Sequence, residues 1–182
     1  MSKLAKKPLI IPAEVQVKQT DGLLEFTGKE GKLALKVLPF ITVEIKDGQV
    51  SFKSENTMKQ ARANLGTMAS LCKNAVEGVS TGYSKVLEID GIGYKAAAEG
   101  SNIVFNVGLT HPVKYTPPSG VKVTLEKNLI KVTGVDKFLV GEIAAQMRKI
   151  SPPEPYKGKG IHYKGEQIRR KAGKKVAGTG TA

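Results

Sequence analysis

The pattern of apolar residues in this 182-residue chain occurs twice along its length, and this repeat limits the possible folds more than any other feature. Apolar and polar residues alternate from Val43 to Phe52, interrupted by Asp47-Gly48, a pair typical of a hairpin turn. The alternation returns from Val123 to Val132, with Lys127-Asn128 in place of the turn. The constant offset between the two runs therefore predicts two copies of one small unit.

The same alternation precedes this hairpin in each copy. In the first copy it surrounds a second hairpin signal, Asp21-Gly22, and continues from Leu33 to Val37. We match residues 33–37 to the alternating run that begins at Ile103 in the second copy. This match leaves the second copy with an extra loop of about ten residues, 111–120, which contains two consecutive prolines.

A helix is predicted to follow the strands of each copy. The first, near residues 57–77, carries one apolar stripe at helical spacing, made of Met58, Ala61, Leu65, Met68, Cys72 and Ala75. We expect Gly78 and Gly82 to end it. The second, near residues 136–150, begins at the candidate N-cap Asp136 and repeats the stripe with Val140, Ala144 and Met147.

The predicted fold class is α+β, with two tandem duplicated domains, each a mostly antiparallel β-sheet covered by one α-helix. Residues 1–82 form the first domain and residues 83–151 the second, with residues 78–87 as the link. Residues 152–182 form a basic C-terminal extension. A period near 80 exceeds the 20–50 residues of solenoid repeats. The alternative is a chance resemblance of two α+β segments.

Most of the positive charge lies near the C-terminus. The whole chain has a net charge of +13, and residues 148–175 hold ten Lys or Arg and two acidic residues, a net charge of +8. We call residues 151–175 the basic segment. Its prolines remove backbone donors and its glycines favour unusual dihedral angles, so neither helix nor central strand is expected there. The segment is predicted to be loop-like and to become ordered only when it binds a partner.

Residue types in the basic segment predict contacts with a nucleic acid. Lys and Arg bind phosphates, glycine lets the backbone approach closely, and tyrosine stacks on a base or sugar or packs against the second domain. A solvated, disordered tail is the alternative. The candidate RNA-binding residues are Tyr156, Lys157, Gly158, Lys159, Gly160, His162, Tyr163, Lys164, Arg169, Arg170, Lys171, Lys174 and Lys175.

Composition leaves few other functions open. An isoelectric point near 9.8 indicates a polyanionic partner: nucleic acid, an anionic membrane surface or an acidic protein. No apolar run is long enough to span a membrane, and no signal peptide is recognisable. The single Cys72 is expected to be a core residue of a cytoplasmic protein. The two histidines, His111 and His162, look like polar loop residues, so we expect no enzyme, metal or cofactor.

The run SPPEPYKGKGI, residues 151–161, closely resembles the signature of the sixth family of large-subunit ribosomal proteins. The bacterial form continues as this chain does, through HYKGE at 162–166, the cations at 169–171, and Lys174-Lys175. Residues 2–12 and 83–96 resemble the start and centre of the family, so the likeness covers residues 2–175. His162 stands where arginine is common, as do Lys3 and Lys95, and Ala5 stands where glycine is common.

The resemblance implies a non-enzymatic protein of the cytoplasmic ribosome with two domains that arose by duplication. It implies that the second domain and the basic extension bind 23S rRNA. It also implies a position near the base of the stalk and the sarcin–ricin loop, beside neighbouring large-subunit proteins and the docking site of translational GTPases. An architectural protein that binds double-stranded nucleic acid is the alternative function, and an RNA-modifying enzyme is a third.

Overall fold

The computed structural model describes residues 7–46, 48–56, 58–100 and 102–173, and the chain divides into two compact units. Unit 1 takes in the chain up to Ser84 together with residues 133–140, and unit 2 takes in the rest, from Lys85 onward. Neither helix in the described ranges combines the length and the apolar character that a transmembrane span requires.

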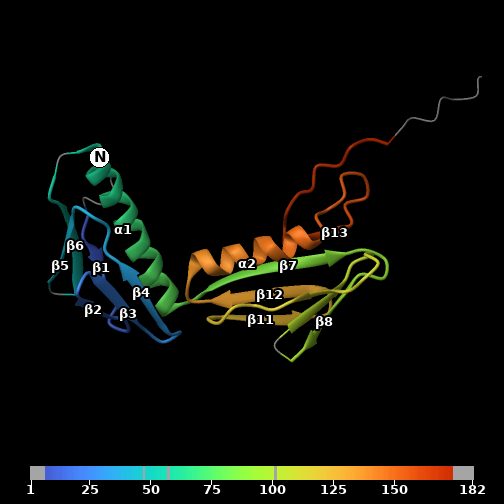
Figure 1. Cartoon of the computed structure of the whole chain (residues 1–182), viewed down its shortest axis with the longest axis horizontal. Helices are drawn as coiled ribbons and strands as arrows, with labels where there is room; N and C mark the ends of the chain where they lie inside the picture. The colour runs from blue at the N-terminus through green and yellow to red at the C-terminus, as the bar shows by residue number, and fades with distance from the viewer. Residues whose placement is uncertain (1–6, 47, 57, 101, 174–182) are drawn as a thin grey trace, which may run out of the picture. The chain divides into compact units, whose positions relative to one another are not determined.

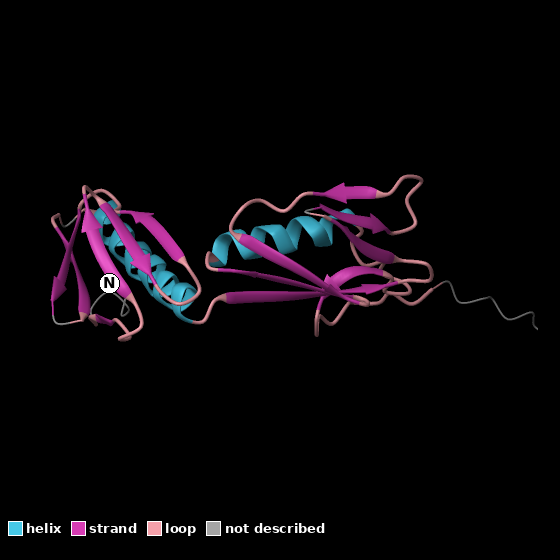
Figure 2. Cartoon of the chain, turned by 90° about the horizontal axis from the view of Figure 1, so that it is seen from below, coloured by secondary structure: helices cyan, strands magenta, loops and turns pink. Residues whose placement is uncertain are grey.

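Unit 1 packs one long helix against two three-stranded antiparallel sheets (Figures 1 and 2). One sheet has the strand order β1-β6-β5 and the other β2-β3-β4. The helix contacts β3, β4, β5 and β6. The elements are β1 (Leu9–Ile10), β2 (Gln16–Thr20), β3 (Leu23–Thr27), β4 (Lys32–Lys36), β5 (Ile41–Lys46), β6 (Gln49–Ser54) and α1 (Lys59–Ser80).

The predicted hairpins and apolar stripe position the core of unit 1. Thr20 pairs with Leu23 across the first turn, where Asp21 and Gly22 both have positive φ, as a type I′ turn requires. In the second turn, Asp47 lies outside the described residues. Leu24, Phe26, Val50, Met68, Cys72 and Ala75 are all buried in the core. Met58 is an exception to the stripe because it precedes the helix and is 58% exposed.

Helix α1 is longer at its C-terminal end than predicted. Gly78 was expected to end it, but the helix runs through Gly78 to Ser80. A Cβ at Gly78 would clash with the backbone carbonyl of Val135, so this glycine allows close packing and does not stop the helix.

The second copy adds one strand to the same order of elements. Its strands and helix are β7 (Tyr83–Asp90), β8 (Lys95–Glu99), β9 (Asn102–Asn106), β10 (Val113–Tyr115), β11 (Val121–Glu126), β12 (Leu129–Gly134), α2 (Lys137–Ile150) and β13 (Gly160–Tyr163). The sheets have the orders β10-β9-β8 and β11-β12-β7-β13. Helix α2 runs along the four-stranded sheet (Figure 1) and buries Val140, Ile143, Ala144 and Met147.

Strand orders match between the copies, since β1-β6-β5 corresponds to β7-β12-β11 and β2-β3-β4 to β8-β9-β10. The strands β5 and β11 begin at equivalent positions of the sequence repeat, Ile41 and Val121. Asp136 caps α2 as predicted, because its carboxylate accepts the N–H of Phe138 at 2.8 Å.

Two details of the predicted repeat are wrong. The run at Ile103 belongs to β9, which corresponds to β3 and not to residues 33–37. Residues 111–120 are not an extra loop, since they contain β10, the counterpart of β4. The predicted link is also wrong in part, because residues 83–87 lie in β7, the counterpart of β1. The strand β13 has no counterpart in unit 1 among the described residues.

Candidate nucleic-acid interface

The basic segment contains an edge strand at residues 160–163, so the prediction that the segment is loop-like is wrong for these residues. β13 pairs antiparallel with β7, placing Ile161 opposite Ile89 and His162 opposite Glu88. The N–H of Ile161 also donates to the carbonyl of Ser151 at 2.7 Å, and its side chain is fully buried. The prolines precede the strand and do not interrupt it, so they cost no ladder hydrogen bond. Residues 160–163 therefore have their structure without a partner, and ordering on binding is the wrong prediction for them.

A tight turn before β13 presents the first two lysines. Glu154 donates its N–H to the carbonyl of Lys159 at 2.8 Å, and Gly158 donates its N–H to the carbonyl of Glu154 at 2.9 Å. Gly158 has a φ of +75°, which favours glycine. Lys157 at the tip is exposed and Lys159 is half-buried.

Gly160 serves packing within the protein. A Cβ at this position would lie 2.7 Å from the carbonyl oxygen of Pro152 and 2.7 Å from the Cα of Pro153. Its φ is +146°. The close backbone approach predicted for Gly160 is therefore made to the proline run, which gives the glycine a structural reason that needs no RNA.

An ion pair joins the end of α2 to the residues after β13. Arg148 donates to the two carboxylate oxygens of Glu166, from Nη2 at 2.6 Å and from Nε at 3.1 Å. The N–H of Tyr163 donates to the same carboxylate at 3.0 Å. The hydrogen bonds from Arg148 and then from Tyr163 lower the pKa of Glu166, although partial burial opposes this. The bidentate geometry therefore fastens the turn after β13 to the helix.

Tyr163 lies among cations of the protein itself. Lys85 Nζ is 5.7 Å from the centre of its ring, and the Arg148 guanidinium is 5.8 Å from it. Distances of this size are typical of cation–π contacts. Of the two roles predicted for Tyr163, packing against the second copy agrees with this geometry. Tyr156 is 55% exposed and remains open to a ligand.

His162 is not the polar loop residue predicted, because it lies on β13 and is 6% exposed. Its Nε2 is 3.0 Å from Asp90 Oδ2, and its Nδ1 is 3.0 Å from the carbonyl oxygen of Tyr163. Both partners are acceptors, so only the doubly protonated imidazolium donates to both. Burial lowers the pKa of His162, but the hydrogen bonds to Asp90 and Tyr163 and the charges of Asp90 and Glu88 outweigh it, and the pKa is raised above 6.5.

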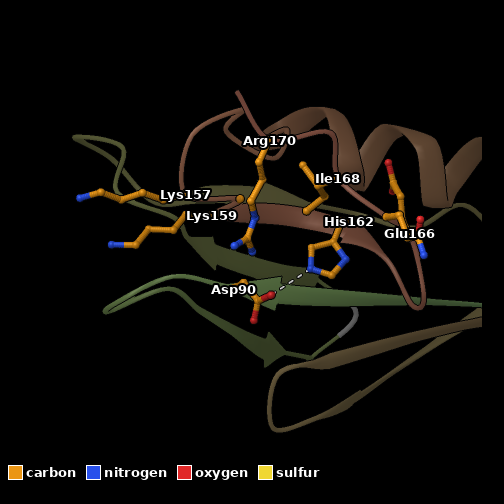
Figure 3. A pocket seen from close by; sticks show the side chains of 9 residues that line it. Asp90, Lys157, Lys159, His162, Glu166, Ile168 and Arg170 are labelled. Atoms are coloured by element: carbon orange, nitrogen blue, oxygen red, sulfur yellow. Dashed lines mark hydrogen bonds and ion pairs between the residues drawn. The ribbon is translucent and has the colours of Figure 1, made fainter. Parts of the chain in front are cut away.

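A pocket of about 550 Å³ opens beside this histidine (Figure 3). Figure 3 shows the guanidinium of Arg170 reaching toward Asp90, while the ammonium groups of Lys157 and Lys159 point outward at the rim. The pocket is lined by Asp90, Lys157, Gly158, Lys159, His162, Glu166, Gln167, Ile168 and Arg170. It brings a cationic rim, two carboxylates and one apolar side chain to the same place, and the Glu166 carboxylate is already paired with Arg148.

The predicted site residues differ in exposure. Tyr156, Lys157 and the cations at 164, 169, 170 and 171 are exposed, Lys159 and Tyr163 are half-buried, and Gly158, Gly160 and His162 are buried. Lys174 and Lys175 lie outside the described residues. The predicted site residues did not include four residues that line the pocket, Asp90, Glu166, Gln167 and Ile168. Asp90 is 72 residues from His162 along the chain, so no local spacing indicates their contact.

Within the described residues, no group of three or more His, Cys, Asp or Glu side chains has an arrangement that holds a metal ion. Cys72 is buried, and burial raises the pKa of its thiol to about 12, so the thiol is the inert core group predicted from the sequence.

Comparison with known proteins agrees with the two-copy organisation. The family described as ribosomal protein L6 matches residues 11–82 and again residues 91–164. A protein of Maridesulfovibrio salexigens named large ribosomal subunit protein uL6 is 47% identical over 175 residues, which cover 96% of this chain and 98% of that protein. Proteins of the same name from Campylobacter lari and Hydrogenobaculum sp. are 47% and 44% identical and cover the same share of this chain, and the alignments span 98% and 96% of those proteins.

These matches confirm the resemblance drawn from residues 151–161 and the predicted fold class. Two matched segments in one chain are the result expected of a tandem duplication, and they fall on the two copies of the strand order. The chain belongs to the ribosomal protein L6 family.

Proposed function

We propose that this protein is a structural constituent of the large ribosomal subunit and binds 23S rRNA through its second copy and the basic segment. The relatives named large ribosomal subunit protein uL6 support the first part of the proposal. The observation that carries the second part is a set of cations held on an ordered scaffold. Lys157, Lys159, Lys164 and the cations at 169–171 make no ion pair with any carboxylate of the described residues. Cations without such partners are available to phosphates.

The scaffold makes this arrangement different from a solvated tail. The strand β13 lies in a sheet, and the pair of Arg148 and Glu166 holds the turn that follows it. The lysines at 157 and 159 are consequently presented at a fixed turn, and less conformational entropy is lost when RNA binds.

The finer features of the proposal come from the family resemblance. We place the protein near the base of the stalk and the sarcin–ricin loop of the cytoplasmic ribosome. Its other partners there are neighbouring large-subunit proteins, and translational GTPases dock close by. Its role is to neutralise phosphates and hold local RNA structure, and no catalytic step is part of it.

Charge reversal tests the proposal. Changing Lys157 and Lys159 together to glutamate should weaken binding to deproteinised 23S rRNA by at least about tenfold, because two phosphate contacts become repulsive. The control changes Lys29 and Lys32 to glutamate, since both are exposed cations of unit 1. Filter binding gives the affinities, and circular dichroism checks that both variants fold.

Equal losses in the two variants would contradict the assignment of binding to the second copy. A competition arm adds duplex DNA of matched length. If duplex DNA displaces 23S rRNA at equal concentration, the alternative function, an architectural protein for double-stranded nucleic acid, replaces the proposal.

A further inference from the structure

The pocket beside β13 has walls of three chemical kinds, and one ligand fits all of them. Lys157, Lys159 and Arg170 provide positive charge, Asp90 provides hydrogen-bond acceptors, and Ile168 provides an apolar surface. A volume of about 550 Å³ is within the roughly 300–1,000 Å³ of small-ligand sites. The inference below rests on the proposed function and concerns the same surface.

The guanidinium of Arg170 lies close to the turn at Gly158. A Cβ at Gly158 would lie 3.2 Å from the Arg170 Nη2 and 3.3 Å from its Nε, so the glycine leaves room for this close approach. This planar cation makes no ion pair among the described residues. A guanidinium plane of this kind both binds phosphate and stacks on a base.

Asp90 distinguishes this pocket from a simple anion site. Its carboxylate is held through one oxygen by His162 Nε2 at 3.0 Å, yet its side chain remains 64% exposed. A carboxylate repels a bare phosphate, but it accepts hydrogen bonds from a ligand that carries N–H groups. The ligand should therefore combine an anionic group with donors.

We propose that this pocket binds one unpaired guanine nucleotide of the rRNA. The N1–H and N2–H of guanine are adjacent donors and match the two oxygens of Asp90, whereas uracil offers one donor flanked by acceptors. The base lies against Ile168 and the guanidinium of Arg170, and the flanking phosphates meet Lys157 and Lys159. Unpaired bases read on their Watson–Crick edges are the usual target of sequence-specific RNA recognition.

Mononucleotide titrations of the full chain test the ligand class. GMP, UMP and inorganic phosphate are each added to ¹⁵N-labelled protein, and the amide shifts of Gly158, Lys159 and Gly160 are followed by NMR. GMP should saturate these shifts at a concentration about tenfold lower than UMP or phosphate, as expected of one bidentate contact. Asp90→Asn should abolish this preference, and Glu126→Gln, a change at an exposed carboxylate of β11, should keep it.

Equal affinity for GMP, UMP and phosphate would overturn the proposal and leave a plain anion site. Absence of binding by all three would overturn it as well. A preference for GMP that survives in Asp90→Asn would show that the carboxylate does not read the base, which also contradicts the proposal.

Binding to intact 23S rRNA separates this inference from the proposed function. Arg170→Ala removes a wall of the pocket, whereas Arg169→Ala removes an exposed cation that does not line it. Arg170→Ala should weaken binding about tenfold and Arg169→Ala about two- to threefold, as expected for one phosphate contact. Equal losses in the two variants would contradict the nucleotide pocket but not the proposal that the protein binds rRNA. Failure of the wild-type protein to bind 23S rRNA would contradict the proposed function itself.

Discussion

His162 is a buried histidine with a hydrogen-bond acceptor beside each ring nitrogen. The imidazolium donates to Asp90 and to the carbonyl of Tyr163, and the pKa of His162 is raised as a result. A raised folded-state pKa stabilises the protein below the ordinary value near 6.5, and this contribution disappears as pH rises through the folded-state pKa. An arginine in place of His162 would carry a charge at all these pH values.

We therefore predict a pH-dependent stability difference between wild type and His162→Gln. Urea unfolding should show the variant less stable at pH 5.5 and the difference smaller at pH 8.5. The stability of His162→Arg should depend on pH less than the stability of wild type does. His111→Gln, a change at an exposed position, should behave as wild type. A difference that stays constant from pH 5.5 to 8.5 would mean that His162 is not charged in the folded protein.

Gly160 is predicted to tolerate no side chain. In Gly160→Ala the new Cβ meets Pro152 and Pro153 at a positive φ, so the free energy of unfolding should fall by about 2–5 kcal/mol. Gly165→Ala is the matched control because Gly165 has a φ of +79° but open space around it. It should cost only about 1–2 kcal/mol, and equal losses in urea denaturation would show that the contact with the prolines is unimportant.

At the scale of elements, the edge strand β13 contributes a buried side chain to the core of the second copy. Ile161 is fully buried, and replacing it with alanine should cost about 2–5 kcal/mol of unfolding free energy. Ile92→Ala, at a residue that is 89% exposed, should change the stability by less than about 0.5 kcal/mol. Chemical denaturation of both variants measures the difference. If the loss of stability at Ile161 is as small as that at Ile92, the result would contradict the paired strand β13 and favour the loop predicted from the sequence.

The periodicity of apolar residues was sufficient to predict the helices and the hairpins but not every strand. The stripes of α1 and α2 and the turn at Asp21 are local patterns, and the structure agrees with them. The short strand β10 lies between Pro112 and Pro117, so its surroundings indicated a loop. The strand β13 depends on pairing with β7, which is distant in the sequence, and its glycines and prolines favour a loop by local preference.

The candidate site divides in the same way. The cations of residues 157–171 could be predicted as RNA-binding residues from composition alone, because the density of charge along the sequence is visible without the tertiary structure. The contact of Asp90 with His162, the pair of Arg148 and Glu166, and the pocket itself arise from strand pairing, so only the structure identifies them.

Across the whole molecule, the positive charge is concentrated in one short stretch near the C-terminal end of the sequence. Residues 148–175 carry a net charge of +8, against +5 for all of residues 1–147. If six to eight of these cations meet phosphates, log K against log[salt] should have a slope of roughly −4 to −7 for 23S rRNA. The double change of Lys157 and Lys159 to glutamate should make the slope shallower by about 2. Filter binding from low to high KCl gives both values, and a wild-type slope near −1 would contradict the phosphate-binding role.

The late position of β13 in the sequence has a consequence for the order of synthesis. A nascent chain that has been translated through α2 already contains β7, β11 and β12, but the edge of β7 stays open until residues 160–163 leave the exit tunnel. Closure of that sheet and arrival of the cations of the basic segment are then close together in time, because β13 lies between Lys159 and Lys164. A chain that ends before β13 would lack most cations of the basic segment and would leave the edge of β7 unpaired, and an unpaired strand edge favours aggregation.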